Sequence, residues 1–142
     1  MGRFGLGTGK GGRYRRRVST FPVCDDLLDE SVELLQLPDV AKMLSVPVTR
    51  THQMLRQHEF IAVRRDGIVG VPTQFLTTSG GAARVVKSLP GTIALLRDGG
   101  YENDEILRWL FTDDPSLPGR PADVLRGDHA REVVRRAQAM AF

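Results

Sequence analysis

The sequence predicts a mostly α-helical protein with a small β-hairpin, and three observations lead to this prediction. Apolar residues recur at helical spacing on both sides of a break at Pro47, a residue that cannot continue a helix. Two strand-like segments, IAVRR and IVGVP, then flank Asp66-Gly67, a dipeptide that favours a two-residue type I′ turn. Helical patterns recur from there to the end of the chain. Two helices, a tight turn and a basic hairpin are the layout of a winged helix-turn-helix, here followed by a C-terminal helical subdomain.

The winged helix-turn-helix is expected over residues 37–76. Its first helix should run from about Pro38, which suits a first helical turn, to Leu44. The second should cover about 49–57, with Thr49 as its N-cap. Val48, Thr51, Leu55 and Phe60 form an apolar set at helical spacing, and the inward positions of the helix itself are Thr51, Leu55 and partly Met54. The outward side chains are Arg50, His52, Gln53, Arg56 and Gln57.

This outward set has the chemistry of a recognition helix in the major groove of DNA. Arginine can bond bidentately to guanine, and glutamine can do the same to adenine. A solvated polar helix face explains the same residues without DNA. The tight turn before the helix and the basic hairpin after it favour the DNA interpretation.

The hairpin carries Arg64 and Arg65 beside its turn, so residues 64–67 form a basic wing. Two arginines at the tip of a wing are suited to phosphates or to the minor groove. An ordinary hairpin with solubilising charges is the alternative.

Residues 1–36 are expected to form a disordered basic tail and an acidic linker. Residues 1–20 carry six Lys and Arg residues, no acid and no hydrophobic period. Residues 21–36 carry five acids and read as a short helix or a linker. The stretch GLGTGKGG is not a phosphate-binding loop, because Gly11 rather than Ser or Thr follows Lys10.

Three interpretations of the basic tail stand side by side. It can be an arm that adds phosphate contacts to those of the recognition helix. It can be a regulatory segment, since a phosphate on Thr8, Ser19 or Thr20 would place about two negative charges among the arginines. It can also be an inert solvated tail.

The C-terminal subdomain is expected over residues 82–142, packed on the winged helix-turn-helix. Residues 73–76 should close the wing with one helical turn, and 77–81 should be a flexible connection. Helices follow, and Trp109, the one tryptophan of the chain, is expected to anchor the core. Arg131, Arg135 and Arg136 of the last helix are either a solvated face or a second DNA contact.

No residue pattern points to an enzyme, a cofactor or a metal site. There is no nucleophile–base pair, and the single Cys24 permits neither an intramolecular disulfide nor a cysteine zinc site. His52, His58 and His129 have no spacing that would build a metal site. No apolar run approaches the length of a membrane span, and one cysteine suits a reducing cytoplasm.

A resemblance to a known family rests mainly on blocks after the wing. The segments LPDVAKMLSVPVTRTHQMLRQHEFIAVRR, VVKSLPGTIALLRDGGY, EILRWLF, DPSL and AREVVRRAQAMAF resemble a small actinobacterial, mycobacterial-type winged helix-turn-helix DNA-binding protein. The resemblance covers residues 37–142 and implies a regulator that is a substrate of a membrane Ser/Thr protein kinase. Thr8 is the candidate acceptor. His58 departs from the family pattern, which has glycine at this bend.

The sequence therefore predicts a cytoplasmic, nucleoid-associated DNA-binding regulatory protein. The expected partners are double-stranded DNA and, for tail phosphorylation, a Ser/Thr protein kinase. The alternative is a protein-interaction adaptor that uses the C-terminal helices, because WLFTDDPSLPGRPADVLRG is similar to the C-terminal module of some toxin–antitoxin antitoxins.

Overall fold

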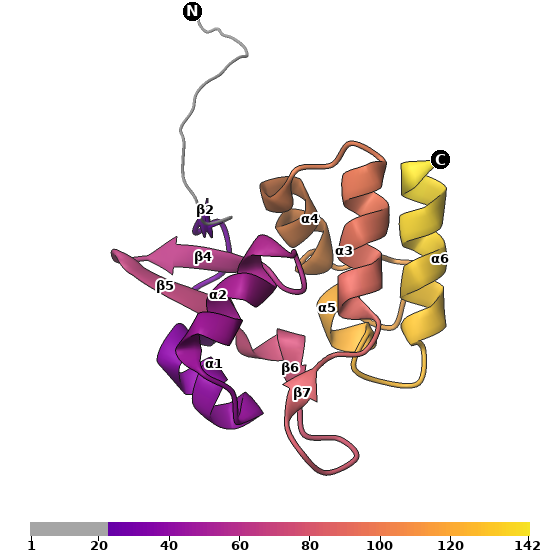
Figure 1. Cartoon of the computed structure of the whole chain (residues 1–142). Helices are drawn as coiled ribbons and strands as arrows, with labels where there is room; N and C mark the ends of the chain where they lie inside the picture. The colour runs from indigo at the N-terminus through magenta and orange to yellow at the C-terminus, as the bar shows by residue number, and fades with distance from the viewer. Residues whose placement is uncertain (1–22) are drawn as a thin grey trace, which may run out of the picture.

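A four-stranded sheet forms one side of the molecule in the computed structural model, which describes residues 23–142 (Figure 1). In sheet order, the strands are β2 (Val23–Asp25), β4 (Ala62–Arg65), β5 (Ile68–Pro72) and β3 (Leu34–Gln36). β2 is parallel to β4, and the other two pairs are antiparallel. The expected hairpin is thus the central pair of a larger sheet.

The two outer strands correct the expectation of a helix or linker in the acidic stretch. β2 and β3 come from this stretch, and Val32 between them is only 2% exposed. The acids fill the connection instead. There, carboxyl oxygens of Asp26 and Asp29 accept hydrogen bonds from backbone N–H groups two residues later, as is typical of Asx turns. β2 pairs with β4 and β3 pairs with β5, and both partner strands lie far along the chain. Local residue spacing does not reveal such pairing.

The helix-turn-helix consists of α1 (Leu37–Leu44) and α2 (Val48–Arg56). Ser45 takes a left-handed backbone with φ 57° and ends α1. The proline ring fixes φ of Pro47 at −65°, and with ψ at 153° the backbone there is extended, so this residue is the N-cap of α2. The expected N-cap, Thr49, therefore lies within the first helical turn, and no side chain caps α2.

The remaining elements are mostly helical and lie on the other side of the molecule (Figure 1). They are the 3-10 turn η2 (Thr73–Phe75), β6 (Leu76–Thr77), β7 (Arg84–Val85), α3 (Leu89–Asp98), α4 (Asn103–Leu110), α5 (Pro121–Val124) and α6 (Ala130–Ala141). β6 and β7 pair as a small antiparallel ribbon where the sequence suggested only a flexible connection. α3 and α6 lie side by side, and Gly99 permits this, because a Cβ there would stand 2.7 Å from Cα of Ala141.

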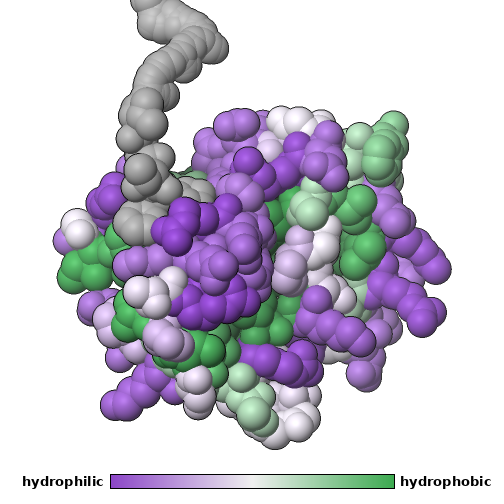
Figure 2. All heavy atoms as spheres, in the orientation of Figure 1, coloured by the Kyte–Doolittle hydropathy of each residue, from purple (hydrophilic) through white to green (hydrophobic). Residues whose placement is uncertain are grey.

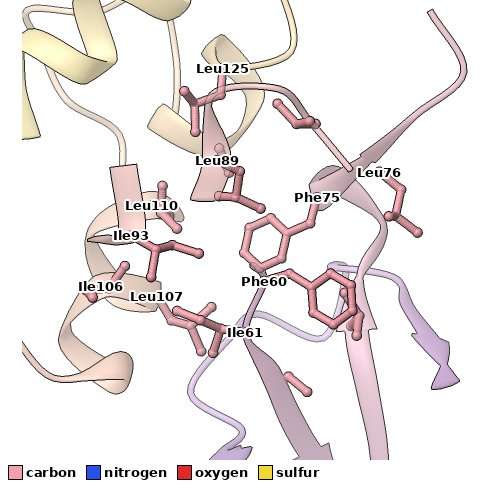
Figure 3. Packing of buried hydrophobic residues seen from close by; sticks show 14 of the residues in the cluster. Phe60, Ile61, Phe75, Leu76, Leu89, Ile93, Ile106, Leu107, Leu110 and Leu125 are labelled. Atoms are coloured by element: carbon pink, nitrogen blue, oxygen red, sulfur yellow. The ribbon is translucent and has the colours of Figure 1, made fainter. Parts of the chain in front are cut away.

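One hydrophobic core joins the winged helix-turn-helix to the C-terminal helices (Figure 3). Phe60 and Phe75, from the first part of the chain, are almost fully buried beside Ile93 and Leu107 from the second. Trp109 lies at the edge of this core, half-buried. No helix among residues 23–142 combines the length and the apolar character that crossing a membrane requires.

Candidate nucleic-acid interface

α2 exposes a polar face because its apolar positions are buried. Thr51, Met54 and Leu55 point into the core. The polar residues on the remaining surface of α2 and its C-cap are Thr49, Arg50, His52, Gln53, Arg56 and Gln57. Figure 2 shows hydrophilic residues gathered over this helix, in purple. The structure thus brings all five predicted outward residues of the recognition helix onto one surface.

Residues four positions apart on α2 form two parallel rows on this surface. The first row is Val48, His52 and Arg56, and the second is Thr49, Gln53 and Gln57. Five of the six residues are exposed, namely Val48, Thr49, Gln53, Arg56 and Gln57, and His52 is half-buried. The rows place hydrogen-bond donors and acceptors along the helix axis, which is the direction that a groove would follow.

Arg50 lies beside these rows and is held by two neighbours. Its Nη1 donates a hydrogen bond to Oε1 of Gln53 at 3.1 Å, and its Nη2 lies 3.5 Å from Oε2 of Glu59. Glu59 was not among the predicted site residues, although its carboxylate adds a negative charge beside the polar face of α2. The ion pair offsets that charge and restrains Arg50 at the same time.

Val48 is more exposed than the other members of its apolar set. The sequence grouped it with Thr51 and Leu55, but the residue is 40% exposed at the first position of α2. The helix begins about one residue earlier than expected, directly after Pro47. An apolar side chain therefore stands in the first row beside His52.

The two wing arginines lie on opposite faces of the sheet, because successive side chains of a strand alternate. Arg64 is exposed and shares its face with Val71 and Leu35 of the neighbouring strands. That face is the one on which α1 packs, since Leu35 and Met43 line the same shallow pocket. Arg64 therefore projects on the helix-turn-helix side of the sheet.

Arg65 points to the other face and is held by the connection between β2 and β3. Its guanidinium pairs with the carboxylate of Asp26 at 2.5 Å and donates to the backbone oxygens of Val32 and Asp29 at 2.8 and 3.2 Å. The hydrogen bond from Arg65 lowers the pKa of Asp26, and that bond also raises the pKa of Arg65. Arg65 is therefore engaged within the protein, whereas Arg64 is exposed, and the predicted contact of Arg65 with DNA stays a prediction.

The bend after α2 requires a left-handed backbone, and His58 supplies it with φ 58°. A side chain in this region is strained, which is why glycine suits such a bend. Nδ1 of His58 is buried and has no hydrogen-bond partner among the residues that the structure describes. Burial, together with the positive charge of Arg97, lowers the pKa of this histidine. The wing turn has the same backbone requirement, with φ 53° at Asp66 and 78° at Gly67, which confirms the predicted type I′ geometry.

Burial and the carboxylate of Asp104 raise the pKa of Cys24 to about 12, so its thiol is not a nucleophile at neutral pH. Across residues 23–142, no group of three or more His, Cys, Asp and Glu residues could hold a metal ion.

The charge of the chain is divided unevenly between its parts. Residues 1–22 hold six of the 20 Lys and Arg residues and none of the 17 acids. The winged helix-turn-helix, from residue 23 to residue 76, has five cations and eight acids. The region 82–142 has nine of each. The proposed phosphate acceptors Thr8, Ser19 and Thr20 fall in the first of these regions, outside the described residues.

Comparison with known proteins gives a consistent set of matches. A family model for the wHTH domain of the DNA-binding protein Rv2175c matches residues 20–76, and a second, for the Rv2175c C-terminal domain of unknown function, matches 86–141. The DNA-binding protein Rv2175c of Mycobacterium tuberculosis (strain ATCC 25618 / H37Rv) is 49% identical over 138 residues, covering 89% of this chain and 92% of that protein. The NMR structure of Rv2175c matches with a TM-score of 0.76 and 47% identity, covering 97% of this chain and 99% of that one.

Proposed function

Because the chain belongs to the Rv2175c family of winged helix-turn-helix DNA-binding proteins, we propose that it is a regulatory protein that binds double-stranded DNA. α2 enters the major groove, and Arg64 of the wing contacts the backbone. The observation that carries this proposal is the polar surface of α2, where two rows of side chains lie exposed after a sharp turn.

The side chains of α2 have different roles in DNA recognition. Arg56 and Gln53 are exposed and have the geometry for bidentate bonds to guanine and adenine. Arg50 is 40% exposed and reaches a base or phosphate after releasing Glu59. His52 and Gln57 complete the two rows. Arg65 contributes indirectly by fixing the wing against the β2–β3 connection.

The basic tail supplies the electrostatic attraction that the folded part lacks. Residues 23–142 have 14 cations and all 17 acids, so their formal charge is negative. A protein that neutralises phosphates releases counterions, and its affinity falls steeply as salt rises. We therefore infer that a large share of this salt dependence comes from the six cations of residues 1–22.

The decisive measurement is a titration with duplex DNA at two salt concentrations. Arg56→Glu should lower the affinity at least tenfold, because it removes a base contact and adds repulsion. Arg108→Glu on exposed α4 is the matched control and should change little. Equal affinity for wild-type protein and the Arg56 variant would sink this placement of the DNA.

Phosphorylation of the tail is the regulation that we propose. A phosphate on Thr8 adds about two negative charges among six cations and weakens the attraction to DNA. Mass spectrometry of the native protein should find phosphate at Thr8, Ser19 or Thr20. A protein phosphorylated by a Ser/Thr protein kinase should bind DNA more weakly than the unmodified protein, and Thr8→Ala should bind equally with and without kinase treatment if Thr8 is the acceptor.

A second candidate function is that of a protein-interaction adaptor. Two observations favour it: the C-terminal region has equal numbers of cations and acids, and Figure 2 shows hydrophobic residues (green) on the side of the C-terminal helices. Capture of partners from lysate with and without nuclease separates the two functions. Partners that survive nuclease support the adaptor. If the protein binds DNA instead, a fluorescent fusion of it should lie over the nucleoid in the cytoplasm.

A further inference from the structure

Val48 is an apolar side chain on a surface that is otherwise polar. Four large hydrophobic residues are exposed in the described part of the chain, and Val48, at 40%, is the one that lies on α2. The others are Met43, Ile68 and Phe142.

The fold itself does not require valine at this position. Val48 is the first residue of α2, where the helix has no side-chain cap and where a β-branched residue has no special advantage. The core below α2 is filled by Thr51, Met54 and Leu55. A polar residue at position 48 would suit both the helix terminus and the solvent, so the exposed part of the valine is available for an apolar contact outside the chain.

The position of Val48 indicates what that partner is. The N-terminal residues of a recognition helix lie closest to the base edges. Val48 begins the row that continues through His52 and Arg56, so it faces the same groove as these residues. The C5-methyl group of thymine is the apolar group that the major groove displays, and apolar side chains read it by contact.

We propose that Val48 is a specificity-determining residue that recognises the methyl group of a thymine. This inference rests on the DNA contact proposed above. It adds an apolar contact to the polar surface of α2, for which the base contacts predicted from the sequence were those of arginine and glutamine. Each methyl–methyl contact excludes water from both groups, and this gives a modest but base-specific preference.

The test begins with selection of bound sequences from a random duplex library by the full-length protein. Wild-type protein should enrich a thymine at one position near the N-terminus of α2. Val48→Ala should lose this preference and keep the neighbouring ones. Met43→Ala, which removes a similarly exposed apolar side chain from α1, should keep all of them. Equal melting temperatures of the three proteins should show that folding is unchanged.

A second measurement removes the methyl group from the DNA instead of the protein. Replacing the selected thymine with deoxyuridine should weaken wild-type binding about fourfold, the effect of one methylene-sized contact. The same replacement should not affect Val48→Ala. Equal wild-type affinity for thymine and deoxyuridine, or an unchanged preference in Val48→Ala, overturns the role of Val48 while leaving DNA binding intact. A wild-type protein that enriches no sequence overturns sequence-specific DNA binding itself, and the role of Val48 with it.

Discussion

The recognition helix α2 and the wing use their cations in opposite ways. On α2, Arg56 projects into solvent, and Arg50 is held by one carboxylate at 3.5 Å while staying 40% exposed. On the wing, Arg65 is folded back onto Asp26 and two backbone oxygens, which leaves Arg64 as the outward cation. Two adjacent arginines in a sequence therefore do not form one basic surface, because side chains alternate along a strand and the two lie on different faces of the sheet.

The two elements also meet the same backbone requirement differently. The wing turn places Asp66 and Gly67 in the left-handed region, and both residue types tolerate it. The end of α2 places His58 there, with a Cβ and a buried ring nitrogen that lacks a partner among residues 23–142. The reading helix thus ends in local strain, whereas the wing does not.

The largest effect should come from removing the two exposed reading side chains of α2. Gln53→Ala combined with Arg56→Ala should lower the affinity for a selected duplex by about 100-fold, since each bidentate contact contributes ~1–3 kcal/mol. The melting temperature should stay within a degree or two, because both residues are exposed. Fluorescence anisotropy checks the first value and calorimetry the second. A loss no larger than that of a wing variant would break the distinction between helix and wing.

Removal of Arg65 should act on stability instead of affinity. Arg65→Ala removes the guanidinium that donates to the Asp26 carboxylate and to the oxygen of Val32, at a cost of about 1–2 kcal/mol after allowance for partial exposure. DNA affinity should change by less than twofold. Denaturant unfolding and DNA titration on the same samples give both values. A variant that unfolds like wild type yet binds DNA poorly would show that Arg65 contacts DNA directly.

The same ion pair predicts a dependence of stability on pH. Arg65 lowers the pKa of Asp26 in the folded state. Its contribution is therefore complete above the ordinary aspartate value of about 3.9 and is lost as the pH falls through the lower folded value. Asp26→Asn should unfold more easily than wild type at neutral pH, and the difference should shrink below about pH 4.

A substitution at His58 should stabilise the fold, unlike the substitutions at Arg65 and Asp26. His58→Gly should raise the free energy of unfolding by about 1 kcal/mol, because glycine removes the left-handed strain. Burial and Arg97 lower the pKa of His58 from its ordinary 6.5, so wild-type stability should decline as the pH falls below about 6.5. His58→Ala should lose this pH dependence but keep the strain. Thermal melts of the three proteins between pH 7.5 and 5.5 separate the two effects, and equal slopes for all three would refute the titration.

The smallest effect should belong to the outward wing arginine. Arg64→Ala should weaken binding about threefold and reduce the slope of log affinity against log salt by about one, the signature of one lost phosphate contact. Its unfolding should match that of wild type. An Arg64 variant with unchanged salt dependence would leave the wing without a phosphate contact.

Local patterns were sufficient for the elements that depend on neighbouring residues. Pro47 ends one helix and sets the next, and Asp66-Gly67 forms the expected turn, because these features follow from the chemistry of one or two residues. The polar set on α2 was likewise visible, since its spacing fixes one face of a helix.

What the sequence could not reveal depends on residues far apart in the chain. Asp26 and Arg65 are 39 positions apart, and the residues next to either one give no indication that the two form a pair. β2 and β3 are three residues each, too short for a period to be read, and they exist because β4 and β5 offer free edges. The start of α2 at Val48 lies about one residue before the expected start, which is within the usual error at a boundary.

The shared core around Phe60 and Phe75 ties the two halves of the chain into one cooperative unit. A fragment that ends at residue 76 would expose both rings and the neighbouring Ile61 to water, and would bring a collapsed or aggregated state in place of a smaller native one. Amide protons of β4 and of α3 should therefore exchange with solvent through the same global opening. A substitution in the C-terminal helices can weaken DNA binding without touching DNA, by lowering the population of the folded winged helix-turn-helix.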